Sequence, residues 1–255
     1  MTVQTEQGQG RLQGYVVVVT GGSSGIGAAI VRAFAEEGAI LVIGYNQGNE
    51  RAEALRASLP GKGHVARQIP LDDAEAHESL FRDLERDFGK IDVLVNSAGY
   101  TKRIAHKNLA ELSSALFNEM LAINVGGPYS VTRALIGLLE RSGSATVINI
   151  SSVSGFTGLG SNIAYCAAKA ALDTMTVSLA RAFGPDIRFL SLAPAAVDTG
   201  FVTGRSREEL EKKAAQTPLG RVVEPEDVAL AALACVTHLR TATGTRIVID
   251  GGHTL

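Results

Sequence analysis

Residues 15–27 read Tyr-Val-Val-Val-Val-Thr-Gly-Gly-Ser-Ser-Gly-Ile-Gly, and this stretch decides the fold. Its consecutive valines favour a buried strand over residues 15–20. Residues 25–38 then carry isoleucine, alanine and phenylalanine at helical spacing and end at a glycine, which predicts a helix. A strand, a tight glycine-rich turn and a helix in this order are typical of a phosphate-binding α/β unit.

The glycines of this turn have separate expected roles. Gly21 allows the sharp turn, Gly25 lets the backbone approach a pyrophosphate, and Gly27 permits close packing of the helix on the strand. The free N–H groups and the positive dipole end of the helix favour a phosphate at its N-terminus. The sequence therefore predicts a dinucleotide site whose first contacts are Gly21, Ser23, Ser24, Gly25, Ile26 and Gly27.

Short apolar runs alternate with longer helical patterns along the rest of the chain. Continuous apolar strands indicate a sheet buried on both faces, and the intervening helices indicate parallel, right-handed crossovers. The predicted fold class is α/β, a doubly wound parallel sheet (Rossmann-like) in a single domain. Further strands are expected at 40–44, 65–69, 91–96, 146–150, 187–192 and 246–250, and helices at 50–59, 74–88, 113–124, 129–141, 165–183 and 226–236.

The 255 residues suffice for one catalytic domain, which we expect at 12–255. Residues 1–11 are polar, rich in Gln and Gly, and without an apolar signal core, so a flexible arm is expected there. A long connection before the last helix contains a charged, helix-like piece at 207–216. Because long connections often cover binding sites, we expect a lid at about 200–217.

The composition argues against several function classes. The formal net charge is −2, and Lys and Arg are scattered near Asp and Glu, so no nucleic-acid-binding face is expected. The apolar runs are shorter than a membrane span, and a cytoplasmic location is expected. Cys166 and Cys235 lie in alanine-rich helical stretches, where free buried thiols are expected rather than a disulfide framework or a metal site.

Three chemically active side chains are expected to meet at the carboxyl ends of the strands. Tyr165 and Lys169 are four residues apart in a helical stretch and therefore share one face. Ser152 follows the strand expected at 146–150, and strand carboxyl ends line the ligand crevice in this architecture. Chance assembly of this set downstream of a phosphate-binding turn is improbable, so we treat it as a candidate catalytic group.

The residue types suit proton transfer between an alcohol and a ketone. A phenol has a reference pKa of about 10, which is too high for a base near neutrality. The Lys169 ammonium and an oxidised nicotinamide ring would both lower the pKa of Tyr165. Tyr165 would then act as general acid/base, and the Ser152 hydroxyl would orient the substrate oxygen. The expected activity is NAD(P)(H)-dependent interconversion of a secondary alcohol and a ketone.

At this point the chain resembles the short-chain dehydrogenase/reductase family, in the branch of single-domain chains, over nearly its whole length. The motifs that carry the resemblance are Thr20–Gly27, Asn96-Ser97-Ala98-Gly99, Asn124, Ser152, Tyr165-Cys166-Ala167-Ala168-Lys169, Pro194 and Asp250-Gly251-Gly252. They are specific for the family and much less specific for a substrate.

The resemblance implies further roles. Asn96, Ala98 and Gly99 would close the adenosine side of the cofactor cleft, and Asn96 and Gly99 would also stabilise the central sheet. Lys169 would bind the nicotinamide ribose. Asn124 would serve a proton relay to Lys169. The segment from Pro194 would cover the nicotinamide, with Val197 and Thr199 in contact with it. The resemblance also implies a homotetramer, which packs helices 113–141 and 165–183 across one interface and the last strand with residues 250–252 across another.

The chain departs from the family pattern in ways that bear on the cofactor. Ser97 replaces the usual second Asn, and Ala195 replaces a glycine, where a positive φ would strain it. In place of an adenine-binding Asp we expect the Leu71 backbone and the Asp72 side chain. At the end of the second strand stand Tyr45 and Asn46, where NAD users usually carry Asp. A missing carboxylate favours NADP. NAD stays open, because the nearest cation is Arg51.

The substrate is a small molecule that the sequence does not identify. Expected contacts are Ser152, Ser154, Phe156 and Tyr165, with Tyr100, Arg103 and Leu159 as further pocket residues. Arg103 is the expected partner of an anionic substrate. Two other functions stay open: a catalytically silent NAD(P)-sensing binding protein of the same fold, and a sugar-nucleotide epimerase or dehydratase.

Overall fold

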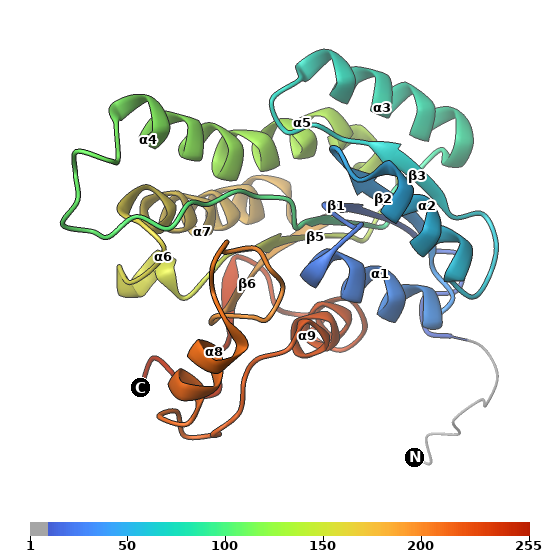
Figure 1. Ribbon diagram of the computed structural model, residues 1–255. Helices are drawn as coiled ribbons and strands as arrows, with labels where there is room; N and C mark the ends of the chain where they lie inside the picture. Colours follow the sequence, from blue (N-terminus) through green and yellow to red (C-terminus); the bar gives the residue numbers. More distant parts are fainter. Residues whose placement is uncertain (1–9) are drawn as a thin grey trace.

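The computed structural model describes residues 10–255, in which a seven-stranded parallel sheet lies between two layers of helices (Figure 1). The strands are β1 (Val16–Thr20), β2 (Ile40–Tyr45), β3 (Val65–Gln68), β4 (Val93–Asn96), β5 (Ala145–Ile150), β6 (Ile187–Pro194) and β7 (Thr245–Ile249). The helices are α1 (Gly25–Glu36), α2 (Asn49–Ser58), α3 (Ala74–Phe88), α4 (Ser114–Leu121), α5 (Gly127–Glu140), α6 (Ser154–Thr157), α7 (Ile163–Phe183), α8 (Arg207–Ala214) and α9 (Pro225–Thr237).

The strand order is β3-β2-β1-β4-β5-β6-β7, which confirms the predicted doubly wound sheet. Successive strands are added in one direction from β1 to β3 and in the other from β4 to β7, so the strand order reverses between β1 and β4. These two strands pair in register from Val17↔Val93 to Thr20↔Asn96. Ligands of such sheets bind in the crevice beyond the strand carboxyl ends at this reversal. The fold therefore places the binding site next to the glycine turn after β1.

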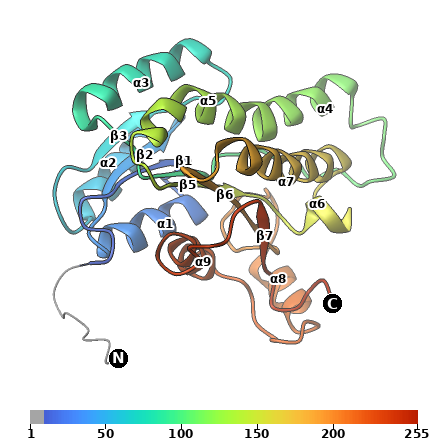
Figure 2. The same cartoon turned by 180° about the vertical axis from the view of Figure 1, so that it is seen from behind.

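Each face of the sheet carries its own core. Helices α1, α2 and α9 pack on one face, and α3, α5 and α7 pack on the other (Figure 2). The central strands bury both faces, as their continuous apolar sequences predict, with Val16–Thr20 almost fully buried, whereas the edge strands β3 and β7 are partly exposed.

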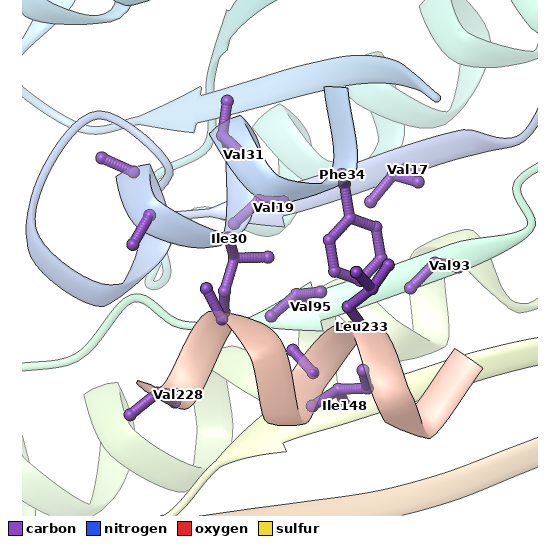
Figure 3. Close-up of a cluster of buried hydrophobic side chains, with 14 of the residues drawn as sticks. Val17, Val19, Ile30, Val31, Phe34, Val93, Val95, Ile148, Val228 and Leu233 are labelled. Carbon is purple, nitrogen blue, oxygen red and sulfur yellow. The ribbon is translucent and has the colours of Figure 1, made fainter. Parts of the chain in front are cut away.

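The apolar side chains of α1 pack into the core that β1 and α9 share. Phe34 and Ile30 of α1 point toward helix α9, whereas Val31 points away from α9 (Figure 3). Leu233 of α9 packs beside Phe34, so α9 covers the apolar face of α1 (Figure 3). Full burial of one such aromatic or branched side chain contributes about 1.5–3 kcal/mol.

Several element ends differ from the predictions. Strand β6 continues to Pro194, because it pairs with β7 as far as Ile249. Helix α7 begins two residues early, at Ile163. The helices expected at 113–124 and 129–141 join through a π-helical turn, Ala122–Gly126, and the short helix α6 was not predicted. Tertiary pairing sets these ends, and local patterns do not report it.

Arg11, near the start of the described chain, and both cysteines have defined surroundings. Of the predicted arm, residues 1–9 lie outside the described residues, whereas Arg11 pairs with Glu37 at 2.6 Å. Cys166 and Cys235 are buried and free, as expected. In the described part of the chain, no helix combines the length and the apolarity that a membrane crossing requires.

Candidate active site

A cavity of about 1300 Å³ opens beyond the carboxyl ends of the strands. It is lined by elements far apart in the sequence: the glycine turn, the ends of β2 and β3, the loop after β4, the start of α7 and the connection between β6 and α9. The predicted residues that line it are Gly21, Ser23, Ser24, Gly25, Ile26, Gly27, Tyr45, Asn46, Leu71, Asp72, Ala98, Gly99, Tyr100, Ser152, Ser154, Leu159, Tyr165, Lys169, Pro194, Val197 and Thr199.

Asn96 does not line the cavity. It is buried at the end of β4, where its Nδ2 donates to Asn149 Oδ1 at 2.8 Å and to Thr132 Oγ1 at 3.2 Å. These bonds join β4 to β5 and α5. The expected direct contact with a cofactor is therefore not supported, whereas these bonds agree with the expected role of Asn96 in stabilising the central sheet.

Asn124 also lies behind the cavity wall. Its Nδ2 donates to the carbonyls of Tyr100 at 2.8 Å and Met120 at 2.9 Å, and its Oδ1 accepts from the Tyr100 N–H at 3.2 Å. The side chain thus holds the loop after β4 against the π-helical turn. Such turns often occur at functional sites.

Phe156 and Arg103 were expected in the substrate pocket, but neither lines the cavity. The Phe156 ring is 39% exposed and lies under the Arg246 guanidinium, 4.1 Å from the ring centroid. Helix α6 turns this ring outward, toward β7. Arg103 pairs with Glu209 at 3.4 Å on the surface. The expected substrate contact of Phe156 and the expected anion contact of Arg103 are not supported.

The glycine turn fits a dinucleotide phosphate. Gly21 and Gly25 have φ of 64° and 50°, which side chains with a Cβ rarely adopt. A Cβ on Gly21 would lie 2.9 Å from Ala98 Cα, and one on Gly25 would lie 3.1 Å from Thr199 Cβ. The turn therefore needs its glycines, and it presents backbone N–H groups at the N-terminus of α1.

Thr20 connects this turn to the next wall of the cavity. Its hydroxyl, at the end of β1, accepts from the N–H groups of Ser97 and Ala98 at 3.1 Å each. These bonds hold the backbone after β4 beside the turn. Ser97, which replaces the family's second Asn, is therefore positioned through its main-chain N–H.

Tyr165 lies in the first turn of α7, and Asn162 sets its position. The Asn162 Oδ1 accepts from the Tyr165 N–H at 2.8 Å and caps the helix. Its Nδ2 donates to the Lys102 carbonyl at 2.7 Å and to Thr101 Oγ1 at 3.3 Å. This buried side chain therefore ties the start of α7 to the loop after β4.

Lys169 lies one turn further along α7, on the same face as Tyr165. Its Nζ is 5.5 Å from the centroid of the Tyr165 ring and donates to the Ile150 carbonyl at 2.8 Å. Burial lowers the pKa of Lys169 to about 8. Near neutral pH the side chain thus still carries its charge beside the phenol.

The pKa of Tyr165 differs from the expectation. Burial raises it above the usual value, whereas a side-chain hydrogen bond with Ser152 and the positive charge of Arg205 lower it. Desolvation of a buried phenolate outweighs these two effects in the protein alone. A low phenol pKa thus requires a further positive charge in the cavity.

Hydrogen bonds with Ser154 position Ser152 beside Tyr165. Its Oγ donates to Ser154 Oγ and accepts from the Ser154 N–H, both at 3.1 Å. Both serines line the cavity between β5 and α7. The predicted Ser152, Tyr165 and Lys169 therefore meet in one wall, as their positions in the sequence indicate.

Arg51 lines the cavity near the end of β2 and the start of α1, away from Tyr165. A Cβ on Gly48 would lie 2.6 Å from Arg51 Nη2 and 3.1 Å from Ser23 Oγ. The Arg51 guanidinium and the Ser23 hydroxyl of the glycine turn therefore lie close together beside Gly48. Tyr45 and Asn46 line the same part of the cavity. Across residues 10–255 the Arg51 guanidinium has no ion-pair or hydrogen-bond partner.

The connection from Ala195 to Glu224 covers the cavity. Thr199 contacts the glycine turn at Gly25, and the Phe201 ring centroid is 6.1 Å from that of Tyr165. The expected strain at Ala195 is absent, because no residue other than glycine has a positive φ within the described chain.

Other lining residues were not singled out from sequence. His106 and Glu119 come from the loop and helix after β4, Arg205 from the connection, and His253 from the C-terminal turn. The loop and the connection carry no spacing signal that marks them. Arg205 lies in the expected lid, and Glu119 lies in a helix for which only an interface between chains was expected.

Comparison with known proteins agrees with this geometry. The family model described as "Enoyl-(Acyl carrier protein) reductase" matches residues 21–254. A crystal structure of a dehydrogenase/reductase from Sinorhizobium meliloti 1021 superimposes with a TM-score of 0.84 at 33% identity, covering 96% of each chain.

Two curated relatives extend over the same length. The chain is 33% identical over 243 residues to cis-4-hydroxycyclohexanecarboxylate dehydrogenase of Sinomonas cyclohexanicum, covering 94% of this chain and 96% of the relative. It is 32% identical over 252 residues to the NADP-dependent (R)-specific alcohol dehydrogenase of Lentilactobacillus kefiri, covering 96% and 98%. The chain belongs to the short-chain dehydrogenase/reductase family and is an NAD(P)-dependent oxidoreductase.

Proposed function

We propose that the protein interconverts a secondary alcohol and a ketone, with Tyr165 as the general acid/base. The observation that carries this proposal is the joint position of Ser152, Tyr165 and Lys169 in one wall of the cavity, opposite a turn that suits a dinucleotide phosphate. A sensor that binds the cofactor without turnover would not need all three. The relatives named as dehydrogenases favour oxidoreduction over sugar-nucleotide epimerisation.

The mechanism follows from the groups in the wall. A bound nicotinamide dinucleotide supplies or accepts the hydride. Ser152 holds the substrate oxygen, and Tyr165 donates a proton to it during reduction or takes one during oxidation. The Lys169 ammonium favours the phenolate form of Tyr165 and binds the nicotinamide ribose. Asn124 holds the loop after β4 against the π-helical turn, and we assign it the proton relay to Lys169 that the family resemblance implies.

Replacement of Tyr165 by Phe tests the assignment. We expect Tyr165→Phe to bind the cofactor with unchanged Kd and to lose about 10²–10⁴-fold in kcat, the usual contribution of general acid/base catalysis. The measurement is a screen of carbonyl substrates followed by nicotinamide absorbance. Tyr129→Phe, on the exposed side of α5, is the matched control. An active Tyr165→Phe enzyme, or no turnover of any carbonyl by the wild type, would refute the proposal.

We further propose that NADP is the preferred cofactor. Support comes from the missing carboxylate after β2 and from the Arg51 guanidinium, which flanks Ser23 where the adenosine ribose of a bound dinucleotide would lie. An unpaired guanidinium is suited to a 2′-phosphate, to which it offers charge-assisted hydrogen bonds.

A charge deletion on α2 tests the preference. We expect the wild type to favour NADPH over NADH in kcat/KM, and Arg51→Ala to lose about tenfold or more of that ratio. Arg56→Ala is the control, because Arg56 lies on the same helix and pairs with Glu53 at 2.7 Å. A wild type that prefers NADH, or a ratio that Arg51→Ala leaves unchanged, contradicts this assignment.

We propose a cytoplasmic homotetramer that acts on a small molecule, in which residues 200–217 close over the bound cofactor and substrate. Support for the lid comes from Phe201, whose ring lies beside that of Tyr165, and from the adjacent Thr199, which lies beside Gly25 of the glycine turn.

A further inference from the structure

The connection over the cavity carries one arginine whose charge is not balanced. Arg205 lines the cavity and is half-buried. Between residues 10 and 255, no carboxylate forms an ion pair with its guanidinium, and no group accepts a hydrogen bond from it.

The neighbouring arginines make this exceptional. Arg207, two residues further on, pairs with Asp198 at 3.1 Å, Glu211 at 3.0 Å and Glu224 at 2.8 Å. Arg221 pairs with Asp227 at 2.7 Å, and Arg103 pairs with Glu209 at 3.4 Å. The fold thus neutralises the arginines around Arg205 with carboxylates and leaves Arg205 facing the cavity.

Arg205 lies at the reacting end of the site. Phe201, on the same stretch of the connection, packs its ring 6.1 Å from that of Tyr165. The charge of Arg205 lowers the pKa of Tyr165, so the two groups are close enough to interact electrostatically. Arg51, by contrast, flanks Ser23 at the adenosine end.

The environment of Arg205 is unfavourable for a cation that has no partner. Burial lowers the pKa of Arg205, and the nearby charge of Arg103 lowers it further, whereas Tyr165 and the carboxylate of Glu209, which is shared with Arg103, raise it by smaller amounts. Half-burying a guanidinium beside another cation costs free energy that an anion in the cavity would offset. The cavity therefore has the electrostatic character of a site for an anion next to the proton-transfer group.

We propose that Arg205 binds a carboxylate carried by the substrate, so that the enzyme acts on hydroxy acids and their oxo acids. The inference rests on the proposed function, because Tyr165 defines where the reacting carbonyl lies. It assigns the substrate's anionic end to the connection between β6 and α9 and corrects the expected anion contact from Arg103 to Arg205. The exposed Lys213 of α8, which also lines the cavity, adds positive charge nearby.

The test compares an acid with its uncharged ester. The probes are 4-oxocyclohexanecarboxylate and its methyl ester, measured as kcat/KM by nicotinamide absorbance and as Kd by calorimetry with the cofactor-saturated enzyme. We expect the wild type to favour the acid by about 10–100-fold, the usual range for a hydrogen bond to a charged group.

Variants identify the residue responsible. Arg205→Gln should reduce the acid-to-ester ratio to about one, and Arg205→Lys should retain part of it, because an ammonium keeps the charge and loses the guanidinium fork. Any change in the pKa of Tyr165 affects both probes alike and leaves the ratio intact. Arg103→Gln is the matched control, because it removes a neighbouring charge outside the cavity, and its ratio should stay within about twofold of the wild type.

The outcomes separate this inference from the proposed function. Equal turnover of both probes by the wild type, or a preference that survives Arg205→Gln, overturns the inference and leaves ketone reduction intact. Arg205-dependent binding of the acid without reduction supports the inference and counts against the proposed reaction. Binding of neither probe, or a raised cofactor Kd in Arg205→Gln with an unchanged ratio, also overturns the inference.

Discussion

Tyr165 and Lys169 show how burial changes the chemistry that spacing predicts. Their four-residue separation places both on one face of α7, and their contact follows from that geometry. The direction of the Tyr165 pKa does not follow from it, because burial raises that pKa and no sequence pattern reports burial of this phenol.

The pKa of Lys169 predicts a pH-dependent stability. Because burial lowers that pKa to about 8 from 10.5, the unfolded chain binds more protons between these values, and the folded state gains stability as pH rises through them. Relative to Lys169→Met, the unfolding free energy of the wild type should therefore rise by about 2–3 kcal/mol from about pH 7 to about pH 10.

Urea denaturation of both proteins without cofactor, at matched pH values, measures this difference. Other titrating groups are common to the two proteins and cancel in the comparison. Parallel pH profiles would mean that Lys169 is not desolvated as its position beside Ile150 indicates.

At the scale of elements, helix ends decide where the site residues lie. The glycine turn could be predicted, since the strand, the turn and the helix are adjacent in sequence. The start of α7 could be predicted only approximately. Its capping residue, Asn162, precedes Tyr165 by three positions and is a common capping type, but its second contact, with Lys102, depends on the tertiary fold.

Substitution of Asn162 separates the cap from the tertiary contacts. Asn162→Ser keeps a cap and loses the bonds to Lys102 and Thr101, and Asn162→Ala loses all three. At about 1 kcal/mol for each bond, Tm should fall by about 4–8 °C for Ser and about 6–12 °C for Ala in a chain of this size. Scanning calorimetry at one protein concentration measures the series, and equal Tm values for the two variants would show that the cap contributes nothing.

At the scale of the molecule, exposed apolar side chains lie where the family resemblance implies contacts between chains. Tyr129 on α5 is 49% exposed, and Val177 on α7 is 38% exposed. Val248, on the edge strand β7, is 42% exposed. Closed symmetric assemblies cover such surfaces by pairing a face with its own copy.

The proposed tetramer can be dissected from one of these faces. Light scattering should give the wild type the mass of four chains, and Val177→Glu should give the mass of two, because a buried, unpaired carboxylate at a self-complementary contact opposes association. Ala57→Glu, at an exposed position of α2, should leave the mass unchanged. A monomeric wild type, or a tetramer that tolerates Val177→Glu, contradicts the expected interface.

By itself, the sequence determined the doubly wound sheet, the phosphate-binding turn and the set of Ser152, Tyr165 and Lys169. These depend on periodicity and on short spacings, which local geometry converts into strands, helices and shared faces. Only the tertiary structure decided that Phe156 turns outward, that Asn96 does not line the cavity and that Arg205 lines it with no ion-pair partner among residues 10–255. Those outcomes depend on which carboxylates and surfaces distant segments bring together, and local spacing carries no information about that.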